Sequence, residues 1–411
     1  MKTFHSDTLD EHMYYYKTKS NASVYIFPKP GYVEKQALVT VRYGAADEED
    51  RFPMGIAHFL EHKLFEDDEK PLFERFTLLG GSVDAFTSQT QTAYYISCVD
   101  NFFENFRLLF KAVQTPYFTD DNVEKEKGII AQEINMYDDN PGWRVYMNLN
   151  RALYGDNGAL SKNIAGTLQS INDITKEMLY DCYKSNYTSD EMAVIVVGDV
   201  EPEAIVEAVD EFFLLPASAS ARTRSLPDAA PVVRNKISSS LQVSQPIFEI
   251  GFKERDFFTP LGLRTATGKV LLDIIVGDSS PLYERLITDG LIDGPCSMDY
   301  ISGSFYGHSV LSAVSDDPMA VLSRVMSEID NIKSNGIDPV RFERIRRKQL
   351  GSFIRGCNSI EMMCGAAAEL FIKDMTLFDY VGAFEKLTLN DCAARLKEHF
   401  FDPAVSIINP L

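Results

Sequence analysis

The chain has 411 residues, and its 60 acidic against 40 basic side chains give a formal net charge of -20 at pH 7. This charge argues against nucleic acid and against an anionic membrane surface as partners, and no apolar run reaches the roughly 18 residues that a membrane span needs. The length favours two domains of about 200 residues each. Residues 1–7 lead into more charge and lack the apolar core of a signal peptide, so a cytoplasmic location is expected.

The spacing of apolar residues defines the expected elements along the chain. In the first half we expect strands at 22–28, 37–43, 83–87, 92–99 and 192–197, and helices at 53–66, 71–79, 101–114, 120–137, 143–153, 175–186 and 201–213. The second half opens with a strand at 247–252 and continues with alternating helices and strands.

Residues 215–235 are rich in Pro, Ala and Ser without periodicity, which is typical of an interdomain linker. They separate an expected N-terminal domain, 1–214, from a C-terminal domain, 236–411. Each half ends with a capped amphipathic helix followed by an apolar strand, and this weak internal repeat indicates two related domains. The six cysteines show no paired framework and are expected to be buried, reduced thiols.

Two histidines in the helix expected at 53–66 predict a metal site. His58 and His62 are four residues apart, so both imidazoles share one helix face and can reach one metal ion. Glu61 points towards the same face and is close enough to hold a metal-bound water. Neutral imidazole suits zinc, and bound zinc makes water a usable nucleophile near neutral pH. The order His-x-x-Glu-His is the inverted-zincin signature, and it outweighs the alternative of a helix that carries two histidines by chance.

Two histidines and a water leave a tetrahedral zinc one protein ligand short. The helix at 120–137 offers Glu124, Glu126 and Glu133. Glu126 and Glu133 are two helical turns apart, so one can bind zinc while the other orients a histidine or the water. Glu133 stands out because its neighbours in the sequence are apolar, whereas most helical glutamates face solvent.

Taken together, these motifs resemble those of the insulinase/pitrilysin family of zinc metallopeptidases, M16, which includes the mitochondrial processing peptidases. The matching residues are His58-Phe59-Leu60-Glu61-His62 with Phe65, Gly80 to Ser88 with Tyr94-Tyr95, and Glu126 to Glu133.

The resemblance implies the site and the fold. His58, His62 and Glu133 would bind one zinc ion per chain in the N-terminal domain. Glu61 would be the general base that activates the metal-bound water and then passes its proton to the leaving amine, and Glu126 would be a supporting acid. The expected fold class is α+β, with two related domains, each a mainly antiparallel sheet covered on one face by helices.

In the family, the strand that corresponds to residues 80–88 lies at a sheet edge beside the metal, where an extended peptide pairs with it. By this resemblance Asp84, Ala85 and Phe86 would line the substrate through strand addition; a plain hairpin strand opened by a glycine turn is the alternative. Asp84 stands where the family usually has asparagine, and an anion there could favour a basic substrate residue or weaken a hydrogen bond.

Active members of the family carry an arginine and a tyrosine, seven residues apart in the C-terminal half, that grip the substrate carbonyl. Ile287 and Asp293 or a neighbour stand in those places here. Tyr300, Tyr306 and His308 are possible substitutes, although we expect them to be ordinary strand residues. We therefore expect a clamshell of two chains, a homodimer or, with slight preference, a heterodimer with a related subunit that lacks the motif.

The expected function is that of a cytoplasmic zinc endopeptidase that cuts extended peptides inside this clamshell. The alternative is a non-hydrolytic subunit that binds peptides or acts as a scaffold and keeps the fold. A purely structural zinc is a weaker third interpretation, because structural sites usually close with four protein ligands.

Overall fold

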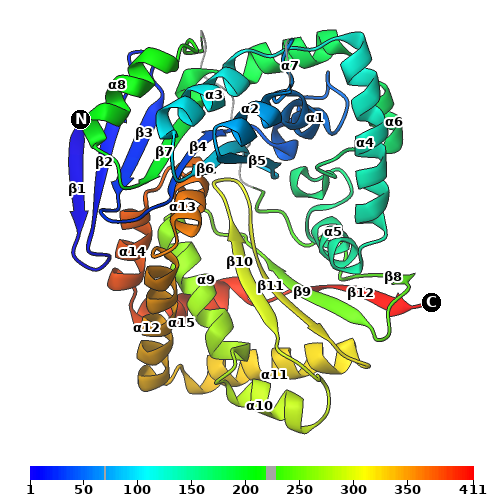
Figure 1. Cartoon of the computed structure of the whole chain (residues 1–411). Helices are drawn as coiled ribbons and strands as arrows, with labels where there is room; N and C mark the ends of the chain where they lie inside the picture. Colours follow the sequence, from blue (N-terminus) through cyan, green and yellow to red (C-terminus); the bar gives the residue numbers. More distant parts are fainter. Residues whose placement is uncertain (69–70, 219–227) are drawn as a thin grey trace. The chain divides into compact units, whose positions relative to one another are not determined.

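The computed structural model describes residues 1–68, 71–218 and 228–411 (Figure 1). Of the linker expected at 215–235, residues 219–227 lie outside the described residues. The chain divides into two compact units, each built from three segments. Unit 1 comprises Met1–Ile134, Lys162–Arg222 and Ile354–Leu377, and unit 2 comprises Asn135–Ser161, Thr223–Phe353 and Phe378–Leu411. The domain limits expected from the sequence stay a prediction.

Unit 1 is built around a seven-stranded sheet with the order β1-β2-β3-β7-β4-β6-β5. Its strands are β1 (Lys2–Ser6), β2 (Glu11–Lys17), β3 (Ser23–Pro28), β4 (Lys35–Val41), β5 (Gly81–Thr87), β6 (Thr92–Cys98) and β7 (Met192–Gly198). The five strands predicted for this half are confirmed, with their ends displaced by at most two residues. The hairpin β1–β2 was not predicted, because its histidines and its run of three tyrosines do not alternate between apolar and polar residues.

The seven helices predicted for the first half are confirmed, and one short helix, Leu168–Asn172, was not predicted. The helices of this half are α1 (Ile56–Lys63), α2 (Leu72–Leu78), α3 (Phe102–Gln114), α4 (Asp120–Asp138), α5 (Pro141–Tyr154), α6 (Leu168–Asn172), α7 (Lys176–Asn186) and α8 (Pro202–Phe212), with short 3-10 helices at Ala45–Asp47, Ala159–Ser161 and Ser189–Glu191. The helix predicted at 53–66 is shorter than expected, because the chain passes through a left-handed conformation at Gly55 immediately before it.

Unit 2 is built around a five-stranded sheet with the order β10-β11-β9-β12-β8. Its strands are β8 (Lys236–Leu241), β9 (Ile247–Lys253), β10 (Ser297–Ser302), β11 (Gly307–Val314) and β12 (Ala404–Pro410). The helices of the second half are α9 (Leu261–Val276), α10 (Pro281–Thr288), α11 (Pro318–Asn335), α12 (Pro339–Gly356), α13 (Ile360–Ile372), α14 (Leu377–Lys386) and α15 (Leu389–His399).

The two sheets repeat one topology. Strands β8-β12-β9-β11-β10 follow the same spatial order as β3-β7-β4-β6-β5. The parallel pair occupies the same place in both, β3 with β7 and β8 with β12, and the remaining pairs are antiparallel. The helix before the last strand begins at a capping threonine in each, Thr175 or Thr388. The α+β class and the two related, mainly antiparallel sheets are therefore confirmed.

Each sheet carries its main helical layer on one face and a further helix that comes from the other half of the chain. In unit 1, helix α13 packs on β7 and β4; in unit 2, helix α5 packs on β12 and β9. All seven residues of β7 are buried, which requires cover on both faces of the sheet. The helix expected at 143–153 corresponds to α5, whereas no separate helix was predicted at the position of α13. Amphipathic periodicity does not say which sheet a helix packs against.

All six cysteines are buried and free, as the sequence predicted. Among the described residues, no helix combines the length and the apolar character that crossing a membrane would require.

The packing of α13 in unit 1 can be tested with two adjacent methionines. Met363 is fully buried, whereas Met362 on the same helix is 61% exposed. We expect Met363→Ala to lower the free energy of unfolding by about 2–5 kcal/mol, since it leaves a cavity, and Met362→Ala to change it by less than about 0.5 kcal/mol. Urea denaturation followed by circular dichroism measures both. Equal losses in the two variants would contradict the placement of α13.

Candidate metal centre

The helix that carries the two histidines is anchored at its first turn by a buried acid. Glu48 Oε1 accepts the backbone N–H groups of Gly55 and Ala57 at 3.0 and 3.1 Å, so this carboxylate replaces a conventional capping side chain. Burial raises the pKa of Glu48 to about 7 against the opposing effect of these hydrogen bonds. Gly55 has a φ of 92°, and a Cβ there would lie 2.7 Å from the Ala165 carbonyl oxygen. No sequence pattern pointed to Glu48, because its partners are backbone groups.

The structure brings His58, His62 and Glu133 together in unit 1. One ligand atom from each lies within 4.8 Å of the other two. The Nε2 atom of His58 lies 3.6 Å from Glu133 Oε1, and the Nε2 atom of His62 lies 3.5 Å from Glu133 Oε2. Ligands bound tetrahedrally to zinc at about 2.0–2.1 Å stand about 3.3 Å from one another. Both distances are close to that spacing, and no two of the three ligand atoms are more than 4.8 Å apart, so the donor set fits a zinc ion once these atoms draw together.

The surroundings of Glu133 differ from what its apolar neighbours in the sequence indicated. Ile130 and Ile134 are buried, but Ile129 and Met136 are 55% and 60% exposed. Only part of the apolar flank is therefore core. The side chain of Glu133 is 22% exposed and faces the two histidines. The apolar neighbours in the sequence therefore pointed to the right residue, although only some of them are buried.

Glu126 contacts one of the histidines and stands outside the cluster of three. Its Oε1 lies 2.9 Å from His62 Nδ1, and its Oε2 accepts a hydrogen bond from the buried Lys63 ammonium at 3.2 Å. When His62 is neutral and its proton is on Nδ1, its lone pair is on Nε2, which faces Glu133. This is the arrangement in which a carboxylate orients a metal-binding histidine.

The two histidines have opposite charge states in the metal-free site. Burial, aided by the charge of His62, lowers the pKa of His58 to about 4, so its imidazole is neutral. Burial also lowers the pKa of His62, but the hydrogen bonds with Glu126 and Glu133 and the nearby carboxylates raise it to about 10. His58 is ready to bind a cation, whereas His62 must first lose a proton.

Glu61 lies beside the cluster and is not one of the three residues with converging ligand atoms. Its Oε2 accepts a hydrogen bond from the Thr87 hydroxyl at 2.9 Å, which ties α1 to the end of β5. Burial raises the pKa of Glu61 to about 7, although the His62 charge and the Thr87 hydrogen bond oppose the shift. Sequence reasoning assigned no role to Thr87, since nothing local shows that its hydroxyl reaches back to α1.

Strand β5 ends the seven-stranded sheet and pairs only with β6 among the described strands. Its outer edge therefore carries backbone groups without a strand partner, as the interpretation of residues 80–88 requires. The exposed Asp84 accepts the Tyr95 hydroxyl at 3.1 Å and its neighbour's N–H at 2.8 Å. Ala85 packs towards the core, and the Phe86 ring lies 6.5 Å from that of Tyr95.

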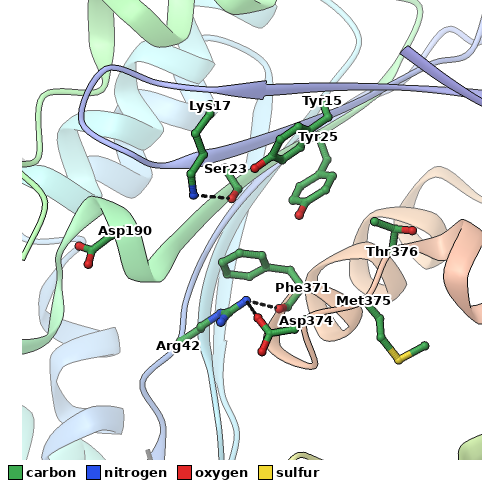
Figure 2. Close-up of a pocket in the computed structure, with 10 residues that line it drawn as sticks. All are labelled: Tyr15, Lys17, Ser23, Tyr25, Arg42, Asp190, Phe371, Asp374, Met375 and Thr376. Carbon is green, nitrogen blue, oxygen red and sulfur yellow. Dashed lines mark hydrogen bonds and ion pairs between the residues drawn. The ribbon is translucent and has the colours of Figure 1, made fainter. Parts of the chain in front are cut away.

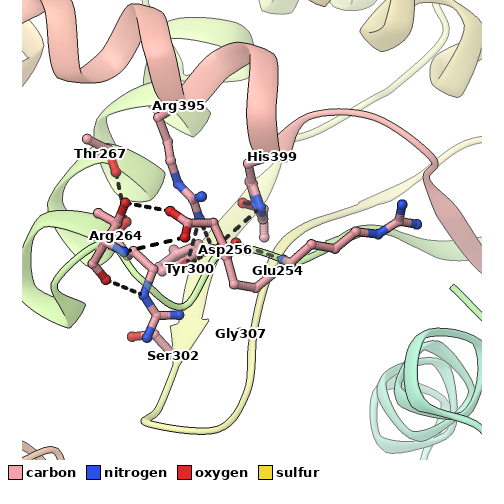
Figure 3. A network of polar contacts seen from close by, with 12 residues as sticks. Glu254, Asp256, Arg264, Thr267, Tyr300, Ser302, Gly307, Arg395 and His399 are labelled. Atoms are coloured by element: carbon pink, nitrogen blue, oxygen red, sulfur yellow. Dashed lines mark hydrogen bonds and ion pairs between the residues drawn. The ribbon is translucent and has the colours of Figure 1, made fainter. Parts of the chain in front are cut away.

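The three candidates for a missing carbonyl grip are buried in unit 2. Tyr300, Tyr306 and His308 are at most 9% exposed. The Tyr300 hydroxyl donates to Glu254 at 2.6 Å within a network of polar contacts (Figure 3), and His308 Nδ1 lies 2.9 Å from the Tyr154 hydroxyl. These side chains are therefore structural. Tyr300 and His308 lie on strands β10 and β11, as the sequence led us to expect, whereas Tyr306 lies in the turn between these two strands. The residues expected in the places of the arginine and the tyrosine are Ile287 and Asp293. Ile287 lies on α10 and is 40% exposed, and Asp293 follows that helix.

Comparison with known proteins identifies relatives of this chain. The family model described as insulinase (peptidase family M16) matches residues 33–168, and the one described as peptidase M16 inactive domain matches residues 173–349. The zinc protease YmfH of Bacillus subtilis is 34% identical over 97% of this chain and 96% of its own length. The mitochondrial-processing peptidase subunit beta of Dictyostelium discoideum is 25% identical over 91% of this chain and 84% of its own length. The crystal structure of an M16-like peptidase from Alicyclobacillus acidocaldarius superposes with a TM-score of 0.91 at 31% identity, covering 98% of this chain and 99% of that one.

Removing the carboxylate ligand tests the donor set. We expect about one zinc per chain in the wild type and an affinity lower by more than about 100-fold in Glu133→Gln, because an amide is a weaker zinc ligand and leaves two histidines alone. The exposed Glu124, on the same helix, provides the control Glu124→Gln. The wild type and the two variants are purified identically and dialysed against the same zinc solution. Elemental analysis then measures the zinc content per chain. Equal zinc in both variants would exclude Glu133 as a ligand.

The charge state of His62 predicts how metal binding depends on pH. Because its pKa is about 10 without metal, the site must release about one proton when it binds zinc at neutral pH. The apparent affinity should then rise about tenfold per pH unit between about pH 6 and 9. Titration against a chromophoric chelator at several pH values measures this slope. An affinity independent of pH over that range would mean that His62 is already neutral in the metal-free site.

Proposed function

This chain belongs to the insulinase family of peptidases, M16, and from that membership we propose that it is a zinc-dependent endopeptidase that cleaves extended peptides. The observation that carries the proposal is the convergence of His58, His62 and Glu133, with Glu61 beside them and the free edge of β5 adjoining Glu61 through Thr87. A structural zinc would be expected to have a fourth protein ligand, and among the described residues only three converge.

The substrate would bind as an added strand. Unpaired N–H and C=O groups on β5 can hold an extended peptide with little regard to its sequence, and side-chain pockets then add preference. Asp84, Ala85 and Phe86 would line it, with the exposed Asp84 placing a negative charge beside the peptide. The net charge of -20 would also favour basic peptides over acidic ones.

Each residue of the site has a distinct proposed role. Bound to His58, His62 and Glu133, zinc would supply Lewis-acid activation of water and stabilisation of negative charge on the peptide oxygen. Glu61 takes the proton of the attacking water and returns it to the leaving nitrogen. Thr87 holds the Glu61 carboxylate in place, and Glu126 holds the His62 ring with Nε2 towards the ligand cluster. Glu126 and Thr87 are thus positioning residues.

We propose that the chain works in a clamshell with a second, related chain. The buried positions of Tyr300, Tyr306 and His308 leave no carbonyl grip from these three side chains in unit 2. The Dictyostelium relative is itself named as a subunit. A partner chain, identical or lacking the zinc motif, would supply the missing contact. Because all six cysteines are free thiols, we place this activity in the cytoplasm.

A second candidate function is that of a non-hydrolytic, peptide-binding subunit. The same absence of a carbonyl grip favours it, because zinc and a bound peptide are compatible with an incomplete catalytic site. The two functions differ in one measurable property, which is turnover.

The test is digestion of a peptide library by the wild type, by Glu61→Gln and by Glu74→Gln, whose residue is exposed on the neighbouring helix α2. Loss of a general base should lower kcat by about 100-fold to 10,000-fold, while zinc content stays at the wild-type level. The control should cleave as the wild type does. A chelator should abolish cleavage in all three proteins.

Full turnover by Glu61→Gln would remove Glu61 as the base. No turnover by any protein, at any chain concentration and with zinc bound, would support the non-hydrolytic subunit. A specific activity that rises with chain concentration would identify self-pairing as the source of the second half of the site.

A further inference from the structure

Unit 1 contains a pocket that the proposed peptidase chemistry does not use (Figure 2). Its volume is about 290 Å³, and its lining comes from β2, β3, the residue that follows β4, the short helix before β7, and the end of α13. Every residue that lines it belongs to unit 1.

The pocket opens on the opposite face of the sheet from the metal centre. On β3, Val24 and Ile26 point into the core that also contains α1, so the intervening Tyr25 points to the other face. Tyr15 pairs directly with Tyr25, and Lys17 pairs with Ser23, so these four side chains form a block on that second face. A ligand in this pocket therefore has no access to His58 or Glu61.

One wall of the pocket is aromatic. The ring centroids of Tyr15 and Tyr25 are 5.2 Å apart, and the Phe371 ring meets Tyr25 edge-on at 6.3 Å. The Arg42 guanidinium lies over the Phe371 ring at 4.1 Å and forms an ion pair with Asp374 at 2.7 Å. This pair is neutral overall and fixes the position of Phe371, to whose carbonyl Arg42 also donates at 2.6 Å.

Two charged groups in the pocket have no ionic partner among the described residues. The Lys17 ammonium donates to the Ser23 hydroxyl at a long 3.3 Å and has no carboxylate within 4.0 Å. The Asp190 carboxylate accepts the Ser218 backbone N–H at 2.7 Å, and no cation of residues 1–68, 71–218 or 228–411 pairs with it. In Figure 2 these two side chains lie towards one side of the pocket and the Phe371 and Tyr25 rings towards the other.

From this arrangement we propose that the pocket binds a small zwitterion with an aromatic side chain, a free α-amino acid or a dipeptide. Its carboxylate would pair with Lys17, its ammonium group with Asp190, and its ring would pack against Tyr25 and Phe371. The site goes beyond the proposed peptidase activity and does not depend on it.

Other ligand classes fit the lining less well. A phosphate group would gain Lys17 but would meet the unpaired Asp190. A simple cation would gain Asp190 but would face Lys17 without compensation. An apolar molecule would remove both charges from water without replacing their hydration, which is unfavourable. Since Lys17 and Arg42 balance Asp190 and Asp374, the lining suits a ligand with no net charge.

Calorimetric titration of the intact chain, with chelator present to keep the metal centre empty, tests the chemistry of the ligand. The probe is L-phenylalanine, for which we expect saturable binding with a Kd of roughly 1 mM or tighter. L-Alanine lacks the ring, N-acetyl-L-phenylalanine lacks the ammonium group, and L-phenylalaninamide lacks the carboxylate. Each should bind at least about tenfold more weakly. Equal binding of any of the three, or no saturable binding of L-phenylalanine, would overturn the proposal.

Two variants and two matched controls test the place of binding. Lys17→Met and Asp190→Asn should each weaken L-phenylalanine binding by about tenfold or more. Lys184→Met and Asp173→Asn, which change exposed residues away from the pocket, should leave it unchanged. Wild-type affinity in both pocket variants would place the ligand elsewhere and refute the site. Circular dichroism verifies that each variant folds. If one pocket variant does not fold, the affinity of the other decides whether the ligand binds in this pocket.

Discussion

The candidate metal centre depends on the hydrogen bond between Glu126 and His62. It fixes the proton on Nδ1 and so directs Nε2 to Glu133. Glu126 itself accepts a hydrogen bond from Lys63, whose side chain is 1% exposed and which also donates to Glu66 at 3.0 Å. A buried ammonium without a carboxylate is costly, so these two acids together offset the burial of Lys63. Because Lys63 follows His62 directly, the same turn of α1 supplies both the candidate ligand His62 and the cation that holds Glu126.

Three buried acids lie on α1 or beside it, and each has donors that offset the cost of its burial. Glu48 accepts two N–H groups at the start of the helix, Glu61 accepts the Thr87 hydroxyl, and Glu126 accepts the Lys63 ammonium group. A buried carboxylate without such donors would take up a proton and lose its function. The helix is therefore fixed at its start, middle and end by contacts to different elements, which gives the histidines one orientation.

The sequence could predict the parts of this site that depend on local spacing. His58, Glu61 and His62 share a helix face because of the helical repeat, and Glu126 and Glu133 are two turns apart on α4. Glu48 and Thr87 could not be predicted, because their partners come close only through tertiary packing. For the same reason the expected helices were found but the exchange of α5 and α13 between the sheets was not. The hairpin β1–β2 was missed because its exposed surface has no apolar alternation.

The two sheets share one topology but differ in the polar groups that follow the matching strands β4 and β9. After β4, unit 1 places α1, whose two histidines converge with Glu133 of α4. After β9, unit 2 places the buried Glu254, which contacts Arg395 and Tyr300 in the network of Figure 3 and accepts two backbone N–H groups. The chain itself therefore supplies the donors that offset the burial of Glu254, whereas in unit 1 His62 carries a proton that a bound cation must displace. The same frame thus supports a self-contained polar network in one unit and a cluster of converging ligand atoms in the other.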